Sequence, residues 1–245
     1  MEQINEQFRT LRLSNMVHAL EQQREQASTY NELSFEERLS LLLEHEILHR
    51  NQNKVKSLKR QAKLRLNAQM SQITYKQGRG LNRKMMAELG TGTYLHKHQN
   101  ILITGATGAG KTFVGCALAD QACEQYQTAK YFRLSRLLDD LAASKLDGSY
   151  QKLLLNLAKK SLLIIDDWGL EKLNQAQSGY LLEVLEDRYQ QSSTIVISQL
   201  PVKEWFKMIT NATVADAILD RLVHNSHRIE LEGESMRKLD QSGHL

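Results

Sequence analysis

Residues 100–112 read Asn-Ile-Leu-Ile-Thr-Gly-Ala-Thr-Gly-Ala-Gly-Lys-Thr, and this stretch decides the fold. Its first five residues have the pattern of a buried strand. The next eight match G-x-x-x-x-G-K-[ST], and apolar residues then recur at helical spacing from Phe113 onward. A strand, a glycine-rich turn and a helix form the context in which this pattern makes a phosphate-binding loop. The alternative is a glycine-rich turn that carries a lysine by chance.

The phosphate-binding loop predicts a role for each of its residues. Its glycines let backbone N–H groups converge on phosphate oxygens, and the helix N-terminus adds its positive dipole end. Lys111 would reach the β- and γ-phosphates, and the Thr112 hydroxyl would ligate Mg²⁺. We therefore expect ATP and Mg²⁺ as ligands. The predicted nucleotide-binding residues are Gly105, Ala106, Thr107, Gly108, Ala109, Gly110, Lys111, Thr112 and Phe113.

Two acids follow another apolar run, Leu162-Leu-Ile-Ile165. Asp166, at the carboxyl end of a strand beside the phosphate strand, would hold Mg²⁺ through water, and Asp167 would polarise the attacking water. The polar end of the run 194–199 offers Ser198 or Gln199 to sense the γ-phosphate. The alternatives are two surface acids and an ordinary polar strand end.

The chain alternates strands and helices from about residue 98, which is typical of a parallel sheet covered by helices. The predicted strands are 100–104, 129–133, 162–166, 194–198 and 227–231. The predicted helices between them are 111–126, 135–145, 149–160, 175–191, 202–209 and 214–224. We predict an α/β ATPase domain with a five-stranded parallel sheet over residues 76–245.

Residues 1–75 are predicted to form a small all-helical domain. Phe8, Leu11, Met16, Val17 and Leu20 indicate one amphipathic helix. A second begins at Ser34, whose hydroxyl can cap it while Glu37 reaches back. Its expected apolar face is Phe35, Leu39, Leu42, Leu43 and Ile47. After a loop at residues 75–80, Asn82 is expected to start a short helix that Gly90 stops.

The net charge of +4 conceals an asymmetry. Residues 50–97 carry twelve Lys and Arg against one acid, Glu88, so this segment is 12 − 1 = +11 and the remainder is 4 − 11 = −7. A basic segment almost free of acids repels itself unless a polyanion is near, so nucleic acid is the expected partner. A solvated basic face is the alternative. The predicted DNA contacts are Lys54, Lys56, Lys59, Arg60, Lys63 and Arg65.

Other features exclude several classes of protein. No stretch approaches the ~20 apolar residues of a membrane span, and the N-terminus lacks the regions of a signal peptide. Cys116 and Cys123 are expected to be core thiols of a reducing cytoplasm. His45-Glu46-Ile-Leu-His49 spells the zinc-protease motif H-E-x-x-H, but no third ligand follows and the basic stretch would repel a cation. We interpret these histidines as part of a polar helical stripe.

Arg221 lies in the apolar run Ala217-Ile-Leu-Asp-Arg221-Leu-Val-His224. With a phosphate loop, a two-acid strand and a polar strand end in this order, the chain resembles AAA+ ATPases. In that family an arginine at this place reaches the γ-phosphate of the neighbouring subunit. The resemblance therefore implies a catalytic role for Arg221 across a subunit contact.

The resemblance narrows to the IstB family of transposition helpers. It is carried by Leu162–Leu170 (LLIIDDWGL), Ser193–Pro201 (STIVISQLP), Ala215–His224 (ADAILDRLVH) and Gly233–Lys238 (GESMRK). The resemblance implies an AAA+ core without a large lid, homo-oligomers on double-stranded DNA, and a partner transposase from the same insertion element. It also implies Arg237 as a sensor beside the nucleotide. The DnaC helicase loaders are similar, more distantly.

Two other functions share some of these features. A helicase loader has every ATPase motif but prefers single-stranded DNA and a replicative helicase. A small-molecule kinase could use the same phosphate loop, but it needs an acceptor pocket and an arginine-bearing lid, and it leaves the +11 segment without a purpose. The transposition helper is the predicted function.

Overall fold

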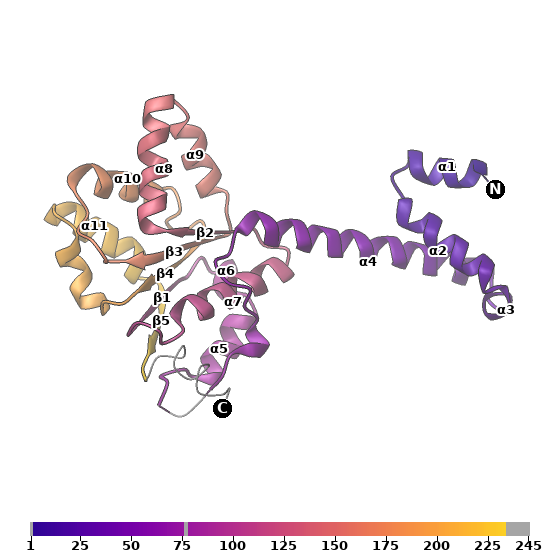
Figure 1. The fold of residues 1–245 in the computed structure, drawn as a ribbon, viewed down its shortest axis with the longest axis horizontal. Coiled ribbons are helices and arrows are strands. Elements are labelled where there is room, and N and C mark those ends of the chain that lie inside the picture. Colours follow the sequence, from indigo (N-terminus) through magenta and orange to yellow (C-terminus); the bar gives the residue numbers. More distant parts are fainter. Residues whose placement is uncertain (1, 76–77, 234–245) are drawn as a thin grey trace, which may run out of the picture. The chain divides into compact units, whose positions relative to one another are not determined.

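The computed structural model describes residues 2–75 and 78–233 (Figure 1). The chain divides into two compact units between Ser57 and Leu58, rather than between residues 75 and 76 as predicted. The difference arises because residues 58–75 belong to the core of the second unit. Ala62, Ala68 and Ile73 are buried in that core.

The first unit is helical, as predicted. Its helices are α1 (Glu2–Thr10), α2 (Ser14–Glu25), α3 (Ala27–Tyr30) and the first part of α4 (Phe35–Ala62). The expected single helix through residues 8–20 is wrong, because the chain breaks between α1 and α2, where Arg12 has a left-handed φ of 57°. The capping box at the start of α4 is confirmed. Ser34 N–H donates to Glu37 Oε2 at 2.7 Å, and Glu37 N–H donates to Ser34 Oγ at 3.2 Å.

The core of the first unit is small. Its buried members are Met16, Ala19 and Leu42. The other side chains of the predicted apolar face of α4 are exposed, from Leu39 at 37% to Phe35 at 67%. Periodicity identified the helix, but only one of its predicted core positions is covered within the described residues.

The second unit alternates strands and helices. It begins with the end of α4 and continues through η1 (Met70–Gln72), α5 (Arg83–Gly90), α6 (Thr93–His96), β1 (Asn100–Gly105), α7 (Lys111–Glu124), β2 (Ala129–Arg133), α8 (Leu134–Asp147), α9 (Tyr150–Ala158), β3 (Leu162–Trp168), α10 (Gln175–Glu186), β4 (Ser193–Ser198), η2 (Val202–Met208), α11 (Ala212–Val223) and β5 (Ser226–Leu231). The Asn82 cap of α5 is confirmed, since its Oδ1 accepts from Met85 N–H at 3.1 Å.

All five strands pair in parallel, in the order β2-β3-β4-β1-β5. The five predicted strands are therefore confirmed. Strand β1 lies between β4 and β5, and β3 lies between β2 and β4. Because the strands are parallel, the carboxyl ends of β1, β3 and β4 lie side by side at one end of the sheet. In open parallel sheets, ligands bind at this carboxyl end.

Successive residues of each buried strand face opposite layers of helices. Ile101, Ile103 and Ile164 pack in the layer that contains α5, α6 and α7. Leu102 and Leu163 pack in the other layer, against α8, α9, α10 and α11 (Figure 1). Both faces of the sheet are covered, which explains why β1, β3 and β4 contain continuous apolar runs. Within the described residues, no helix is long and apolar enough to cross a membrane.

Arg188 is a buried arginine at the end of the sheet where the strands begin. Its side chain is almost inaccessible, with 2% of the residue exposed. Its guanidinium donates to the carbonyls of Leu157, Lys160 and Ser193 and to Thr194 Oγ1, so its partners are uncharged oxygens. Burial lowers the pKa of Arg188 to about 9. Arg188 thereby ties the end of α9 to the start of β4.

Candidate active site

The phosphate-binding loop runs from the end of β1 to the start of α7. Gly105, Gly108 and Gly110 have φ values of 143°, 82° and 93°, which L side chains rarely adopt. At Gly105 a side chain is also excluded by space, because a Cβ there would lie 2.2 Å from the carbonyl oxygen of Leu231. The glycines are therefore required by the backbone that presents the N-terminus of α7.

Lys111 lies within the curve of this loop. Its Nζ donates to the carbonyl oxygens of Gly105 and Ala106, each at 2.8 Å. Burial lowers the pKa of Lys111, and the nearby carboxylates of Asp166 and Asp167 act against that shift. The ammonium group is thus held where phosphate oxygens would meet it.

Thr112 and Asp166 meet at the edge of the sheet, although they lie in α7 and β3. Thr112 Oγ1 donates to Asp166 Oδ2 at 2.8 Å, and Tyr131 from β2 donates to the same oxygen at 2.7 Å. Asp167 N–H donates to Asp166 Oδ1 at 2.8 Å. Burial, and next the hydrogen bond from Tyr131 to Asp166, raise the pKa of Tyr131. The phenol therefore keeps its proton and remains a hydrogen-bond donor.

The oxygens of Thr112 and Asp166 fit Mg²⁺ that arrives with a nucleotide. Mg²⁺ is usually held by one or two protein oxygens together with phosphates and water, rather than by an all-protein cage. Within the described part of the chain, no group of three or more His, Cys, Asp or Glu side chains could hold a metal. A shared site of protein and phosphate oxygens is therefore the arrangement that these residues suit.

Asp167 is turned out of the strand by a local irregularity. The register between β3 and β4 shifts between Ile165 and Trp168, and Asp167 has a φ of 63°. Its side chain is 29% exposed, whereas that of Asp166 is 2% exposed. The two neighbouring acids thus differ in environment: Asp166 is buried and hydrogen-bonded, and Asp167 can reach solvent.

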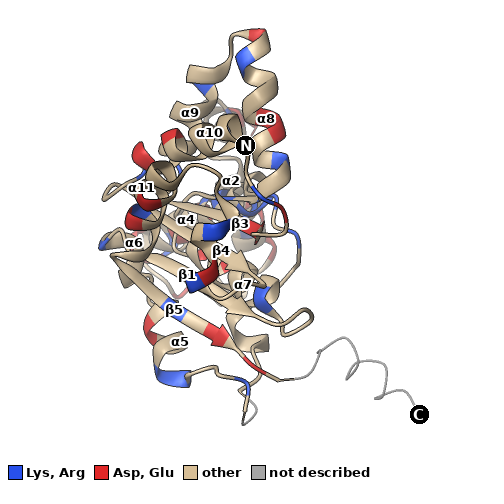
Figure 2. Cartoon of the chain, turned by 90° about the vertical axis from the view of Figure 1, so that its left-hand side faces the viewer, with Lys and Arg blue, Asp and Glu red and all other residues tan. Residues whose placement is uncertain are grey.

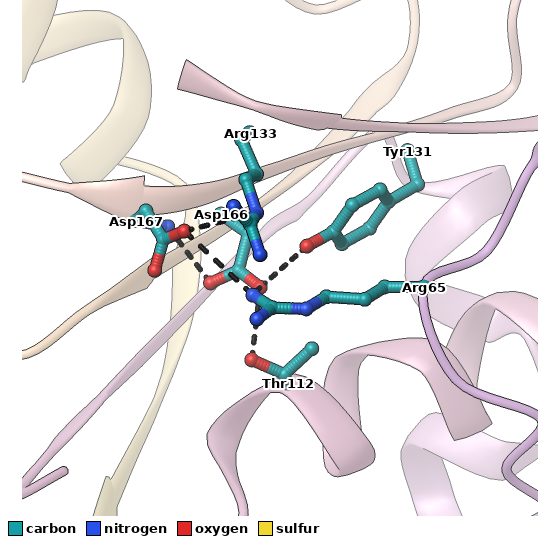
Figure 3. Close-up of polar contacts among 6 residues, drawn as sticks. All are labelled: Arg65, Thr112, Tyr131, Arg133, Asp166 and Asp167. Atoms are coloured by element: carbon teal, nitrogen blue, oxygen red, sulfur yellow. Dashed lines mark hydrogen bonds and ion pairs between the residues drawn. The ribbon is translucent and has the colours of Figure 1, made fainter. Parts of the chain in front are cut away.

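Three residues near these acids were not predicted to belong to the site. Figure 3 shows Arg65, Tyr131 and Arg133 pointing toward the carboxylates. Arg133 Nε lies 3.4 Å from Asp167 Oδ2, and Arg65 Nη1 lies 3.8 Å from Asp166 Oδ2 and 3.7 Å from Asp167 Oδ2. Of these three residues, only Arg133 could have been found from its position, because it is the last residue of a predicted strand. In the structure it is in register with Asp166.

Ser198 and Gln199 differ in what they contact. Ser198 Oγ donates to the Trp168 carbonyl at 2.8 Å and accepts from Leu200 N–H at 3.0 Å, so it is bound to backbone. Gln199 Oε1 accepts from Thr107 Oγ1 of the phosphate loop at 2.7 Å. Of the two residues proposed to sense the γ-phosphate, Gln199 is the one in contact with the loop.

Arg221 lies near the opposite end of the sheet, where the strands begin. The side chain of Asn100, at the start of β1, donates to the carbonyls of Arg221 and Leu222 at 2.9 and 3.2 Å. The Arg221 guanidinium pairs with Glu186 of α10 and donates to the Ala217 carbonyl. The structure therefore separates Arg221 from the phosphate loop of its own chain.

A cavity of about 290 Å³ lies beside the phosphate loop. Gln72 at the end of η1 and the following Ile73 and Thr74 line it on one side, and Phe113 and Val114 line it from α7. Arg79 holds its wall, because it donates to the Thr74 carbonyl at 2.8 Å and to the Ala109 carbonyl at 3.0 Å. Of the residues that line this cavity, Gly110 and Phe113 were predicted to bind the nucleotide, and the others were not.

Two of the predicted DNA contacts are occupied by acids of the same unit. Lys59 Nζ pairs with Asp120 at 2.8 Å and with Glu124 at 2.6 Å. Arg65 lies at the acidic pair described above. Folding thus supplies acids that are missing from their stretch of sequence, and the DNA contacts predicted for these two residues stay untested. Lys56, Arg60 and Lys63 are exposed, and Lys54 stays an untested prediction.

Two remaining predictions concern other parts of the chain. Arg237, the implied nucleotide sensor, lies outside the described residues. In the H-E-x-x-H stretch, Glu46 Oε1 accepts from Arg50 Nε at 2.7 Å, and Glu46 Oε2 accepts from Asn15 N–H at 3.0 Å. Glu46 is thus a buried structural carboxylate, 4% exposed.

Comparisons with known proteins agree with this geometry. Among solved structures, the DnaC helicase loader superposes with a TM-score of 0.56 at 17% identity, covering 70% of this chain and 100% of its own. The replication initiator DnaA, bound to AMPPCP and single-stranded DNA, superposes with a TM-score of 0.58 at 15% identity, covering 74% of this chain and 55% of its own. At these identities the likeness shows the fold alone.

Sequence relatives identify the family. A Sinorhizobium fredii protein named as an insertion sequence ATP-binding protein is 47% identical over 207 residues, 84% of each chain. The Pseudomonas aeruginosa protein named as the ATP-binding protein of insertion sequence IS21 is 29% identical over 93% of this chain and 85% of its own. The family model for IstB-like ATP binding proteins matches residues 6–243. The chain therefore belongs to the IstB-like ATP-binding family and is a P-loop ATPase with the AAA+ fold.

Proposed function

We propose that this ATPase assembles on double-stranded DNA, hydrolyses Mg²⁺-bound ATP at contacts between its subunits, and brings the transposase of its insertion element to that DNA. The observation that carries the proposal is the separation of two catalytic half-sites. The phosphate loop follows β1, and Arg221 lies beside the residue that begins β1.

The separation excludes a contact within one chain. Strand β1 spans Asn100–Gly105, and five residue steps of a strand cover roughly 16 Å. An arginine side chain extends only about half that distance. Arg221 is therefore assigned to the phosphates of a neighbouring subunit, where its charge would stabilise the transition state.

Within one chain, each loop residue has a separate role. Lys111 binds the β- and γ-phosphates, while Thr112 and Asp166 hold the cation, which neutralises phosphate charge when bound. Asp167 is the more exposed of the two carboxylates and orients the attacking water. Gln199 joins the same edge of the sheet and would sense the γ-phosphate through its amide.

The cavity beside the loop suits the adenine base. Ile73, Phe113 and Val114 provide apolar walls, and Thr74 and Gln72 provide polar groups at its edge. Such a mixture of apolar lining and a few polar groups is typical of small-ligand sites. Because Gly110 also lines the cavity, a base placed there is continuous with the phosphate loop.

A group of lysines near the end of α4 supports DNA binding by the ATPase unit. Lys130 has a lowered pKa because of burial first, and then because Lys63 and Lys160 lie close to it. Like charges so placed attract phosphates without reading bases. By contrast, α8 and α11 carry Lys or Arg together with Asp, and α10 carries Glu but no Lys or Arg (Figure 2). We assign the DNA backbone to Arg60, Lys63 and Lys160.

The transposase partner is proposed from the relatives, which are named for the insertion sequences that carry them. The competing function is loading of a replicative helicase, as in the protein whose fold this chain shares. The two functions differ in the DNA they prefer. Preference for duplex over single-stranded DNA, with retention of the transposase in pull-down, supports the transposition helper, and the reverse result supports the loader.

Nucleotide-driven assembly is tested by sizing the protein with Mg²⁺ and a slowly hydrolysed ATP analogue, with and without duplex DNA. The wild type should form larger species when both ligands are present. Lys111→Ala should fold normally but lose nucleotide binding and this growth, because Lys111 contacts only the loop that holds phosphates. A Lys111→Ala variant that binds nucleotide like the wild type would contradict the loop assignment.

DNA contact is tested by a salt titration. If six phosphates are contacted, affinity should fall on the order of 10³-fold between 50 and 200 mM salt. Changing Arg60, Lys63 and Lys160 to alanine should reduce the slope of log affinity against log salt by about 2.7. Alanines at Lys152, Lys172 and Lys203, exposed lysines elsewhere in this unit, form the matched control. Equal slopes for both triple variants would refute this assignment.

A further inference from the structure

Arg65 places a guanidinium against the two carboxylates assigned to Mg²⁺ and water. Its Nη1 lies between Asp166 Oδ2 and Asp167 Oδ2, at 3.8 and 3.7 Å (Figure 3). Although burial opposes it, the hydrogen bond with Tyr131 and the charges of both acids raise the pKa of Arg65. Asp166 Oδ2 therefore faces Arg65, Thr112 and Tyr131 at once.

The backbone around Arg65 is fastened to the helix that starts at the phosphate loop. Burial raises the pKa of the Cys116 thiol, and the backbone N–H groups of Leu66 and Arg65, which lie against the thiol, act in the opposite direction. Cys116 lies one helical turn after Thr112 in α7 and is fully buried. Ala62 and Ala68, on either side of this segment, are also buried. Residues 63–68 are thus held at both the acidic pair and α7.

The two carboxylates at this place already have cationic partners. Arg65 and Arg133 both lie at the acidic pair, so two arginines face two carboxylates. A divalent cation at Thr112 and Asp166 would share Asp166 Oδ2 with the guanidinium. Two cations at one oxygen repel strongly in a partly buried site, so the two occupants exclude one another.

We propose that Arg65 is a positioning residue that occupies the acidic pair in exchange with nucleotide-bound Mg²⁺, and that nucleotide binding releases residues 63–68 from α7. The inference rests on the proposed binding of Mg²⁺ with ATP at Thr112 and Asp166. It adds that the segment joining α4 to the ATPase core changes its attachments when the nucleotide arrives.

Hydrogen–deuterium exchange of the wild-type chain tests the release. With Mg²⁺ and a slowly hydrolysed ATP analogue, amides of the loop at 105–112 should exchange more slowly. Amides at 63–68 should exchange faster, because those of Arg65 and Leu66 would no longer lie against the Cys116 thiol. Slower loop exchange with unchanged or slower exchange at 63–68 would overturn the release but leave the proposed nucleotide site. Unchanged loop exchange at saturating analogue would refute the nucleotide site and the release together.

The Mg²⁺ dependence of analogue binding tests the exchange of cations. Arg65→Ala should lower the half-saturating Mg²⁺ concentration by roughly fivefold, the size expected for losing one partly exposed ion pair. Arg65→Lys should stay near the wild type because it keeps the charge. Arg136→Ala, which removes an exposed arginine paired with Asp139, is the matched control. An unchanged or higher Mg²⁺ requirement in Arg65→Ala would show that Arg65 does not compete for this site.

Discussion

Arg221→Ala is the change that most directly tests hydrolysis between subunits. The variant should bind ATP nearly as well as the wild type, because Arg221 lies roughly 16 Å from the phosphate loop of its own chain. Its hydrolysis should fall ~10³- to 10⁵-fold, the range over which arginines supplied to a neighbouring phosphate act. The partly exposed pair with Glu186 contributes little to the stability of the fold, so the fold should survive.

Mixing Arg221→Ala with Lys111→Ala should restore sites in which an intact phosphate loop faces an intact Arg221. In a random equal mixture of head-to-tail subunits, about one quarter of the contacts join an intact loop on an Arg221→Ala chain to an intact Arg221 on a Lys111→Ala chain. Turnover per chain should therefore recover to about one quarter of the wild-type value. The assay is steady-state phosphate release at fixed total protein, with each variant alone as the baseline.

A control mixture keeps the same stoichiometry. The wild type mixed with a chain carrying both substitutions also leaves about one quarter of the contacts complete, so both mixtures should show equal turnover. If Arg221 acts on its own chain, the first mixture stays inactive and the control retains about half of the wild-type activity. That pattern, in mixtures shown to co-assemble, would refute the reasoning from β1.

Three other changes separate chemistry from stability. Asp167→Asn should bind ATP normally but hydrolyse it ~10²- to 10⁴-fold more slowly, since an amide orients water poorly; normal single-turnover rates would place the base elsewhere. Lys59→Ala should lower the free energy of unfolding by about 1–2 kcal/mol by leaving buried Asp120 unpaired, which urea denaturation would measure. Arg188→Leu should cost about 3–5 kcal/mol, because it strands three carbonyls and the Thr194 hydroxyl; a midpoint like the wild type would contradict that count.

The strands and the phosphate loop could be predicted because their signals are local. Each buried strand is a run of apolar residues next to the motif residue it positions, as Ile165 is to Asp166. The capping box of Ser34 and Glu37 is likewise contained in four residues. Interactions of this kind depend on neighbours in the sequence, so a single sequence contains the information needed to find them.

The roles of Lys59 and Arg65 could not be predicted from the same evidence. The segment looked unneutralised because its acids lie elsewhere in the chain, and Asp120 is 61 positions after Lys59. Tyr131 was missed for a similar reason, since its partner Asp166 belongs to the neighbouring strand. Counting charges along a sequence measures repulsion in the unfolded chain, and folding brings distant charges together.

The break at Arg12 shows a different limit. Neither glycine nor proline marks it, and apolar spacing continues across it from Phe8 to Leu20. The chain turns there through a left-handed arginine, a conformation with no strong sequence signature outside Gly, Asn and Asp. Boundaries of this kind depend on how the two short helices pack.

Strand β1 has a further consequence for how activity scales with assembly. In the proposed mechanism it carries the nucleotide half-site at one end and contacts the helix of Arg221, which completes a neighbour's site, at the other, so every subunit has a front and a back. An open chain of n such subunits has n − 1 complete sites, because one terminal nucleotide faces no neighbour. A closed ring has n. Specific activity should therefore climb with the length of an open assembly and stay constant for rings of any size.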